Sequence, residues 1–256
     1  MIPISVVIIT FNEEKNIERC LRSVQGVADE IIVLDSLSTD RTREICQRFN
    51  VIFVEQPFLG YVEQKNKALD FATYPHILSL DADEALSDDL KKSILEIKQN
   101  WRHDGYCFNR LTNYCSTWVH HCGWYPDRKL RLFDKRKGKW AGNTIHERYL
   151  LDDNSSPHHL SGDLLHYSYY TIDQHIDQIK KFTTIMAQVQ FQKGKKPGLG
   201  KLVLNPFWCF VRQYFVRLGF LDGYHGLVIC CLSAGANFIK YAKTRELFSA
   251  QGSVND

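Results

Sequence analysis

Residues 77–84 read ILSLDADE, a short apolar run that ends in acidic side chains. Similar runs, rich in Val and Ile, occupy residues 4–10, 31–34 and 51–54. Short continuous apolar runs of this kind fit strands that are buried on both faces of a sheet. The segments between them carry apolar residues at helical spacing. The alternation predicts an α/β fold built from βαβ units, with a mainly parallel sheet flanked by helices.

The helical segments carry their own start signals. Residues 17–24 place apolar side chains at i, i+4 and i+7. A second helix is expected to open at the capping residues 38–40 and to continue through Phe49. A third is expected to begin after Ser87 as its cap, with two aspartates in its first turn, where acidic side chains favour the helix dipole.

Polar residues follow three of the predicted strands. The first strand leads into Thr10-Phe11-Asn12-Glu13, the second ends at Asp35, and the fourth ends in Asp81-Ala82-Asp83. Open α/β sheets bind ligands at the carboxyl ends of their strands. The sequence contains no G-x-G-x-x-G and no Walker-type glycine loop, so a dinucleotide site or a P-loop is not expected.

Asp81 and Asp83 are two hard oxygen ligands one residue apart. Such a pair can hold Mg²⁺ or Mn²⁺ with a diphosphate completing the shell. The metal would offset the charge that builds on a departing nucleoside diphosphate. The alternative is a solvated acidic turn that leads into the helix after Ser87. Asp35 likewise either accepts hydrogen bonds from a nucleobase or ribose, or joins a capping network within residues 35–40.

The composition changes after residue 100. Residues 101–170 are dominated by aromatics, Gly and His, with a period-two strand pattern at residues 130–133, and we expect them to form an acceptor pocket. From residue 171 the chain has a helical pattern. We therefore predict a catalytic domain over residues 1–170 and a helical extension over residues 171–256.

The net charge of +3 conceals an uneven distribution. Residues 178–221 hold eight Lys and Arg and no Asp or Glu, interleaved with aromatic side chains. A basic, aromatic helical segment is typical of docking on an anionic membrane surface. Packing on the catalytic domain or on a second copy of the chain is the alternative. No nucleic-acid-binding motif and no long apolar span accompany the charge, so neither nucleic acid nor a transmembrane helix is expected.

Eight sequence motifs are co-linear along nearly the whole chain: SVVIITFNEEKNIERCL, DEIIVLDSLSTDRT, GYVEQKNKAL, ILSLDADE, CGWYPDRKLRLF, NTIHER, GDLLHYSY and RLGFLDGYHGL. Together they resemble the family 2 glycosyltransferases with a GT-A fold. The resemblance is to the bacterial β-1,4-glucosyltransferases of lipopolysaccharide core assembly. It implies a nucleotide-sugar-binding half over residues 1–100 and an acceptor half over residues 101–170.

The resemblance also implies site residues. The nucleotide-sugar site is expected to be lined by Thr10, Asn12, Glu13, Asp35, Lys65, Asn66, Asp81 and Ala82. The metal, Mg²⁺ or Mn²⁺, is expected to be held by Asp83, Asp81 and His146. One departure is DSLSTD where relatives usually have DSGSTD, so Leu37 replaces a turn glycine and gives up easy access to positive φ.

An inverting transfer needs a base that takes the proton from the acceptor hydroxyl. Two carboxylates compete for this role, Asp127 after the aromatic loop GWYP and Glu147 beside His146. Asp127 could instead be a turn residue, and Glu147 could instead pair with Arg148 or Arg131.

The predicted function is an inverting, metal-dependent transfer of a sugar, taken as glucose, from a UDP-linked donor to a lipopolysaccharide-core or lipid-linked saccharide. The alternatives are a transferase onto a protein or an undecaprenyl-linked sugar, and a membrane-docked binding module that is catalytically silent. The cysteines have irregular spacings without C-x-x-C, which indicates reduced thiols, and the N-terminus lacks signal-peptide features. The expected location is cytoplasmic, peripheral on the inner face of a bacterial inner membrane, with a homo-oligomer as a further option.

Overall fold

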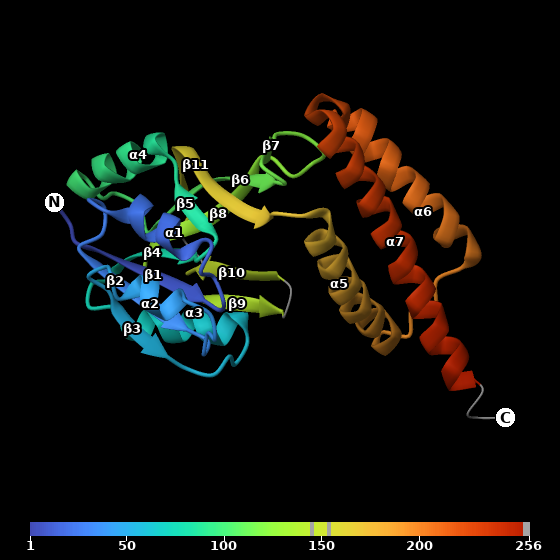
Figure 1. The fold of residues 1–256 in the computed structure, drawn as a ribbon, viewed down its shortest axis with the longest axis horizontal. Coiled ribbons are helices and arrows are strands. Elements are labelled where there is room, and N and C mark those ends of the chain that lie inside the picture. Colours follow the sequence, from blue (N-terminus) through green and yellow to red (C-terminus); the bar gives the residue numbers. More distant parts are fainter. Residues whose placement is uncertain (144–145, 153–154, 253–256) are drawn as a thin grey trace. The chain divides into compact units, whose positions relative to one another are not determined.

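The chain divides into two compact units in the computed structural model, which describes residues 1–143, 146–152 and 155–252 (Figure 1). The sheet unit holds Met1–Leu111 and Asp127–Tyr167. The helical unit holds Thr112–Pro126 and the chain from Ser168 onward.

The sheet unit is built on a mixed sheet. Its strands are β1 (Ile4–Thr10), β2 (Glu30–Asp35), β3 (Ile52–Glu55), β4 (His76–Asp81), β5 (Glu84–Leu86), β6 (Gly105–Tyr114), β8 (Asp127–Asp134) and β11 (His158–Tyr169). Their order is β3-β2-β1-β4-β8-β6-β11-β5. Strands β1 to β4 run parallel, whereas β4–β8, β8–β6 and β11–β5 pair antiparallel. The expected α/β fold is confirmed, but the parallel part ends at β4, where β8 pairs with β4 in the antiparallel direction.

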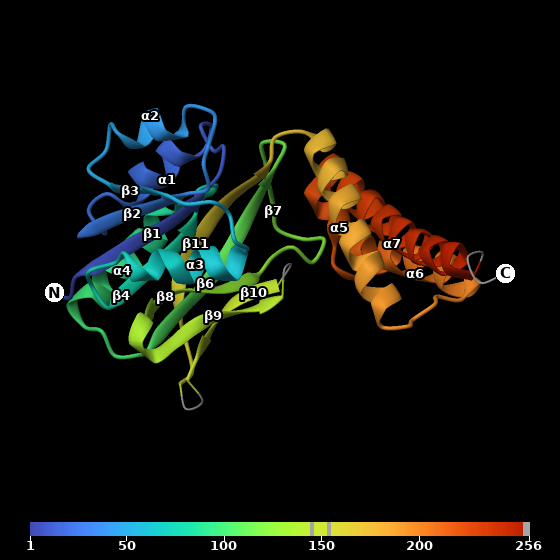
Figure 2. The same cartoon turned by 90° about the horizontal axis from the view of Figure 1, so that it is seen from below.

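Helices and a hairpin cover the two faces of this sheet (Figure 2). They are α1 (Ile17–Val24), α2 (Thr42–Cys46), α3 (Tyr61–Asp70), α4 (Asp88–Gln99), and the hairpin of β9 (Gly138–Asn143) and β10 (His146–Leu151) after the short turn η1 (Lys135–Lys137). Side chains of a strand alternate between faces. Val6 and Ile8 therefore pack with α1, α2 and α4, while Val7 packs with α3 and the hairpin.

One predicted helix begins at its expected cap, and another is shorter than predicted. Ser87 caps α4, because its Oγ accepts a hydrogen bond from the Leu90 amide at 3.2 Å. The second helix opens next to one of its expected capping residues, Asp40, but the prediction is wrong at the end of the helix. Helix α2 begins at Thr42, whose amide donates to Asp40 Oδ1 at 2.9 Å, and it ends before Phe49. Beyond Cys46 the chain continues in i→i−3 turns, which do not propagate an α-helix.

The helical unit contains three long helices and a short strand. Its elements are β7 (Thr117–Val119), α5 (Ile172–Gln192), α6 (Leu199–Val211), the π-helical turn η2 (Arg212–Val216), η3 (Gly219–Asp222) and α7 (Gly223–Gly252). Helix α7 packs against both α5 and α6. Within the described residues, no single helix has the length and apolar character to cross a membrane. The two helical segments Leu199–Val216 and Gly219–Gln251 meet the length and apolarity criteria only when they are taken together, and they are bent by 73° relative to each other.

Candidate active site

The carboxyl ends of β1, β2 and β4 lie side by side. The strand register pairs Thr10 with Asp35 and Ile9 with Asp81, so the residues expected at the site meet at one edge of the sheet. Thr10 Oγ1 is buried there and has no hydrogen-bond partner among the described residues. Buried polar atoms are nearly always paired in folded proteins, so this hydroxyl is available to a ligand.

The loops after β1 and β2 are tied to each other by side chains. The Asn12 amide nitrogen of the backbone donates to Ser38 Oγ at 2.8 Å, and Asn12 Oδ1 accepts from the Thr39 backbone at 2.8 Å. Asp35 is buried and accepts from both the backbone and the hydroxyl of Ser38. The capping network is therefore present, and lone pairs remain on the Asp35 carboxylate for a ligand. Leu37 adopts φ 64°, so this loop keeps the left-handed conformation without glycine.

Glu13 lies just before α1, and the negative charges of Asp83 and Asp40 act on its carboxyl group. Its Oε2 accepts a hydrogen bond from Asn16 Nδ2 at 2.7 Å. The pKa of Glu13 is raised to about 7. Burial is the main cause, and the negative charge of Asp83 contributes to the same rise. The repulsion indicates a concentration of negative charge that a cation would relieve.

Asp81 is neutralised by two buried cations. Arg131 Nη2 donates to Asp81 Oδ2 at 2.6 Å and to Glu84 Oε1 at 2.9 Å, and Lys65 Nζ lies 3.0 Å from Asp81 Oδ1. Burial on its own would raise the pKa of Asp81, but the charges of Arg131 and Lys65 outweigh it and hold that pKa well below its ordinary value. Asp81 is therefore ionised and already paired. The sequence interpretation gave neither Glu84 nor Arg131 a place in this cluster.

Asp83 is the second carboxylate of the motif and has a different partner. Its Oδ2 lies 3.2 Å from Nε2 of His166 on β11. The side chain of His146 lies outside the described part of the structure. Among the described residues, no group of three or more His, Cys, Asp or Glu side chains is arranged to hold a metal ion. Asp83 and His166 nevertheless suit a cation such as Mg²⁺, which usually takes one or two protein ligands and completes its shell with phosphate oxygens and water.

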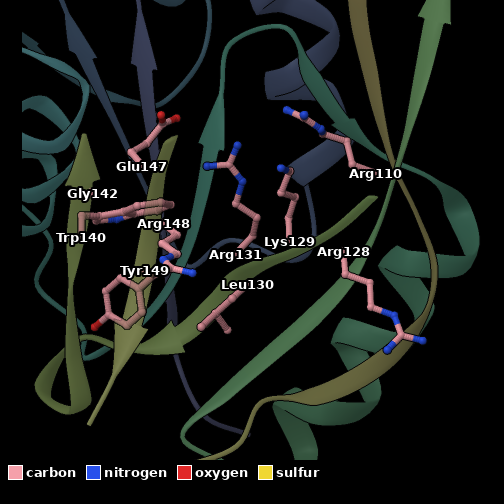
Figure 3. Close-up of a pocket in the computed structure, with 10 residues that line it drawn as sticks. All are labelled: Arg110, Arg128, Lys129, Leu130, Arg131, Trp140, Gly142, Glu147, Arg148 and Tyr149. Carbon is pink, nitrogen blue, oxygen red and sulfur yellow. The ribbon is translucent and has the colours of Figure 1, made fainter. Parts of the chain in front are cut away.

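A cavity of about 890 Å³ opens beside these residues within the sheet unit. Its walls come from β6, β8 and the β9–β10 hairpin, and Figure 3 shows its lining: Arg110, Arg128, Lys129, Leu130, Arg131, Trp140, Gly142, Glu147, Arg148 and Tyr149. The side chains of Lys129 and Arg131 extend in the same direction from β8, and Arg128 extends in the opposite direction (Figure 3), as the alternation of a strand requires. Five of the lining residues are cations and one is a carboxylate, so the cavity is strongly positive.

One candidate base, Glu147, lines this cavity, and the other, Asp127, pairs with residues that line it. Glu147 lines it, and Glu147 Oε1 lies 3.1 Å from Lys65 Nζ, so its ion-pair partner is neither Arg148 nor Arg131. Asp127 opens β8 and is paired with two of the lining residues. Arg110 Nη2 donates to Asp127 Oδ2 at 2.8 Å, and Lys129 Nζ lies 3.0 Å from Asp127 Oδ1.

Asn66 and Ala82 make backbone contacts. Asn66 Nδ2 donates to the Trp140 carbonyl at 2.9 Å, and the Trp140 amide donates to Asn66 Oδ1 at 3.0 Å. Asn66 therefore ties α3 to β9 with both ends of its amide. The Ala82 amide donates to the Ile9 carbonyl at 3.2 Å and fixes the turn between Asp81 and Asp83 against β1.

Comparisons with known proteins identify a family and a fold. Residues 5–155 match the model of the family described as "Glycosyl transferase family 2". An uncharacterized glycosyltransferase of Rickettsia prowazekii is 31% identical, with 95% of this chain and 87% of that protein covered. LpsC of Rhizobium meliloti, a lipopolysaccharide core biosynthesis glycosyltransferase, is 29% identical, with 94% of each chain covered. The solved mannosyltransferase PcManGT of Pyrobaculum calidifontis shares the fold, with a TM-score of 0.53 at 15% identity over 95% of this chain and 87% of that one.

Proposed function

Because the chain belongs to glycosyl transferase family 2, we propose that it transfers glucose from a UDP-linked donor to a lipopolysaccharide-core or lipid-linked saccharide, with inversion at the anomeric carbon. The likeness to LpsC supports this class of acceptor. The donor binds at the carboxyl edge of β1, β2 and β4. The acceptor binds in the cavity between β8 and the β9–β10 hairpin, which is large enough for a saccharide.

The observation that carries this proposal is that Asp81 and Asp83 have different ion-pair partners. Lys65 and Arg131 neutralise Asp81, whereas Asp83 stands near Glu13 and His166 with its charge uncompensated by Lys or Arg in any described ion pair. Asp83 and His166 would hold Mg²⁺ or Mn²⁺. When bound, the metal supplies positive charge to the leaving diphosphate.

The acceptor hydroxyl needs a base, and we assign this role to one of two carboxylates, Asp127 or Glu147. As the hydroxyl oxygen bonds to the anomeric carbon, its proton passes to the carboxylate and the bond from that carbon to the diphosphate oxygen breaks. Cations flank both candidates: Lys65 pairs with Glu147, and Arg110 and Lys129 pair with Asp127.

The central experiment measures donor hydrolysis across UDP- and GDP-sugars with Mn²⁺ and with Mg²⁺. Asp83→Ala should lower the rate at least tenfold. Asp70→Ala is the matched control, because Asp70 is exposed and pairs only with Lys67 in the described structure; it should hydrolyse donor like wild type. Equal turnover by wild type and Asp83→Ala would remove the metal role of Asp83. A wild-type protein that shows neither turnover nor thermal stabilisation by UDP would be a silent binding module.

The base is identified by separating transfer from donor hydrolysis. Asp127→Asn and Glu147→Gln keep the shape of each side chain and remove its basicity. The variant that lacks the base should lose transfer by about 10²–10⁴-fold while UDP still stabilises it against heat. If both variants transfer at the wild-type rate, neither residue is the base.

The helical unit carries a surface suited to a membrane. Leu199, Val203, Leu204 and Phe207 of α6 are each at least 65% exposed and lie along one side of the helix. The surrounding segment is basic. We propose that this apolar side docks on an anionic bilayer, at the inner face of a bacterial inner membrane. Sedimentation with phosphatidylglycerol vesicles tests this, and Phe207→Ser with Leu204→Ser should weaken it. A soluble dimer that these two substitutions dissociate would assign the same side to a second copy.

A further inference from the structure

A second cavity, of about 360 Å³, lies inside the helical unit. Asn205, Trp208 and Arg212 reach it from α6 and its extension, at the i, i+3 and i+7 spacing of a single helix face. Asn237 and Tyr241, four residues apart on α7, form the opposite wall. The walls are joined by a hydrogen bond, because Asn205 Nδ2 donates to the Tyr241 hydroxyl at 2.8 Å.

The π-helical turn η2 brings a second arginine into this cavity. The Arg217 amide donates to the Arg212 carbonyl at 2.8 Å, an i→i−5 bond that closes a wider turn than that of an α-helix. In a continuous α-helix, with about 3.6 residues per turn, a residue five positions later points to a different side. The wider turn therefore places Arg217 beside Arg212, and both line the cavity. Such π turns occur frequently at functional sites.

The cavity is positively charged and contains an unpaired acceptor. Arg212 and Arg217 form no ion pair with any described residue, and no carboxylate lines the cavity. Asp222 is not among the lining residues. Its carboxylate accepts hydrogen bonds from the backbone amides of His120 and His121 and from the Cys122 thiol. Gln213 Oε1 is buried without a hydrogen-bond partner among the described residues. A ligand that suits this cavity carries an anion for the arginines and a donor for Gln213.

We propose that the cavity binds the phosphate of a glycerophospholipid headgroup. The planar guanidinium groups of Arg212 and Arg217 match the geometry of phosphate oxygens, and a headgroup hydroxyl donates to Gln213 Oε1. Trp208 lines the cavity and is 59% exposed, as suits an aromatic ring at the depth of lipid headgroups. Exposed apolar side chains lie between the two arginines and directly after them along the chain: Phe215, Val216, Leu218, Phe220 and Leu221.

This inference rests on the membrane docking proposed above and adds a specific site to it. A diffuse attraction to an anionic surface depends on the number of basic residues near that surface. A headgroup site depends instead on the two parallel hydrogen bonds that each planar guanidinium group can donate to a phosphate. The double variant R212K/R217K separates the two, because it keeps both charges and loses the bidentate geometry.

The experiment measures partitioning onto phosphatidylcholine vesicles that contain either phosphatidylglycerol or oleate at equal surface charge. Wild type should bind the phosphatidylglycerol vesicles at least tenfold more tightly than the oleate vesicles. R212K/R217K should lose that preference while still binding both. The control K195Q/K196Q removes two exposed charges outside the cavity, and it should weaken binding to both kinds of vesicle by the same factor. Far-UV circular dichroism checks that each variant is folded.

A second measurement, with soluble phosphate compounds in place of vesicles, distinguishes a lipid headgroup from free phosphate as the ligand. Glycerol 1-phosphate should shift NMR signals of the wild-type Trp indoles and not those of R212K/R217K, and inorganic phosphate should bind more weakly. Equal partitioning of wild type and R212K/R217K would overturn the headgroup site. Equal binding of inorganic phosphate and glycerol 1-phosphate, without a vesicle preference, would assign the cavity to free phosphate and overturn the lipid. If wild type binds glycerol 1-phosphate but no vesicle, the docking proposal fails and the lipid headgroup fails with it.

Discussion

Replacing Lys65 by Met removes the cation that Asp81 and Glu147 share. Lys65 Nζ lies 3.0 Å from Asp81 Oδ1 and 3.1 Å from Glu147 Oε1, and its side chain is 1% exposed. Met keeps the length of the apolar stem and loses the charge. Both carboxylates then lose a buried partner, although Arg131 still donates to Asp81.

The expected cost follows from the burial of the three side chains. Removing one partner of a buried ion pair costs about 3–5 kcal/mol. The side chains of Asp81 and Glu147 are 27% and 22% exposed, and Arg131 stays in place. We therefore expect the lower end of the range, about 3 kcal/mol in the free energy of unfolding at pH 7. Lys67→Met on the same helix is the matched control, because an exposed pair such as Lys67–Asp70 contributes at most about 1 kcal/mol.

The cost should also depend on pH, because Lys65 helps to hold the pKa of Asp81 below its ordinary value. A carboxyl with a lowered pKa in the folded chain stabilises it above the unfolded pKa, about 3.9 for Asp, and loses this contribution as the pH falls towards the folded pKa. In Lys65→Met the folded pKa of Asp81 is higher than in wild type. The ionised Asp81 therefore stabilises the variant less than it stabilises wild type. The difference between wild type and variant should be full at pH 7 and should shrink as the pH falls through the folded pKa of Asp81 in the variant, which lies between that of wild type and the ordinary value of about 3.9.

Urea unfolding followed by tryptophan fluorescence measures this, and Trp140 reports on the site because its ring centroid lies 4.7 Å from Lys65 Nζ. If Lys65→Met and Lys67→Met cost the same, the buried cation contributes no more than an exposed one. If the cost of Lys65→Met stays equal to its value at pH 7 at every lower pH at which the proteins remain folded, the pKa of Asp81 does not depend on Lys65. Either result would refute the reasoning.

Three further substitutions test other parts of the site. The folded pKa of Glu13 is raised from 4.5 to about 7, so its ionisation destabilises the fold as the pH rises through that interval. Glu13→Gln should thus be more stable than wild type at pH 8 and equal to it at pH 4, by at most about 3 kcal/mol in urea unfolding with EDTA; a gain that is the same at both pH values would contradict this. Leu37→Gly should stabilise by about 1 kcal/mol in thermal unfolding, because glycine reaches φ 64° without the strain of a Cβ, and a loss would show that Leu37 is not strained. Asn66→Ala should cost about 2 kcal/mol and speed hydrogen exchange at the Trp140 amide; unchanged exchange would mean that Asn66 does not anchor β9.

The edge of the sheet was predictable because its signals are local. Each of the runs that ends at Thr10, Asp35 and Asp81 is mostly apolar, and the polar residue at its carboxyl end marks the edge. Ser87 was predictable as a cap for the same reason, since its hydrogen bond reaches only three residues along the chain.

The partners of these residues were not predictable, because they come from distant parts of the chain. Arg131 reaches Asp81 from β8, which lies next to β4 through an antiparallel pairing that no local pattern encodes. His166 is one of several aromatic and His residues in a strand, and nothing in its neighbours marks it as the partner of Asp83. The apolar spacing also misled at the end of α2, where the chain leaves the α-helix after Cys46 and Phe49 lies beyond it.

The π turn at Arg212–Val216 makes the arginine pair sensitive to chain length as well as to residue identity. An i→i−5 turn contains one residue more than the α-helical turn that it replaces. Deleting one residue between Arg212 and Arg217 would leave the two arginines four positions apart, and side chains four apart on an α-helix lie on the same face. An α-helix that kept the arginines five positions apart would instead turn Arg217 to a different side of the helix. A relative without the extra residue should therefore keep the pair in the cavity only if its arginines stand four positions apart.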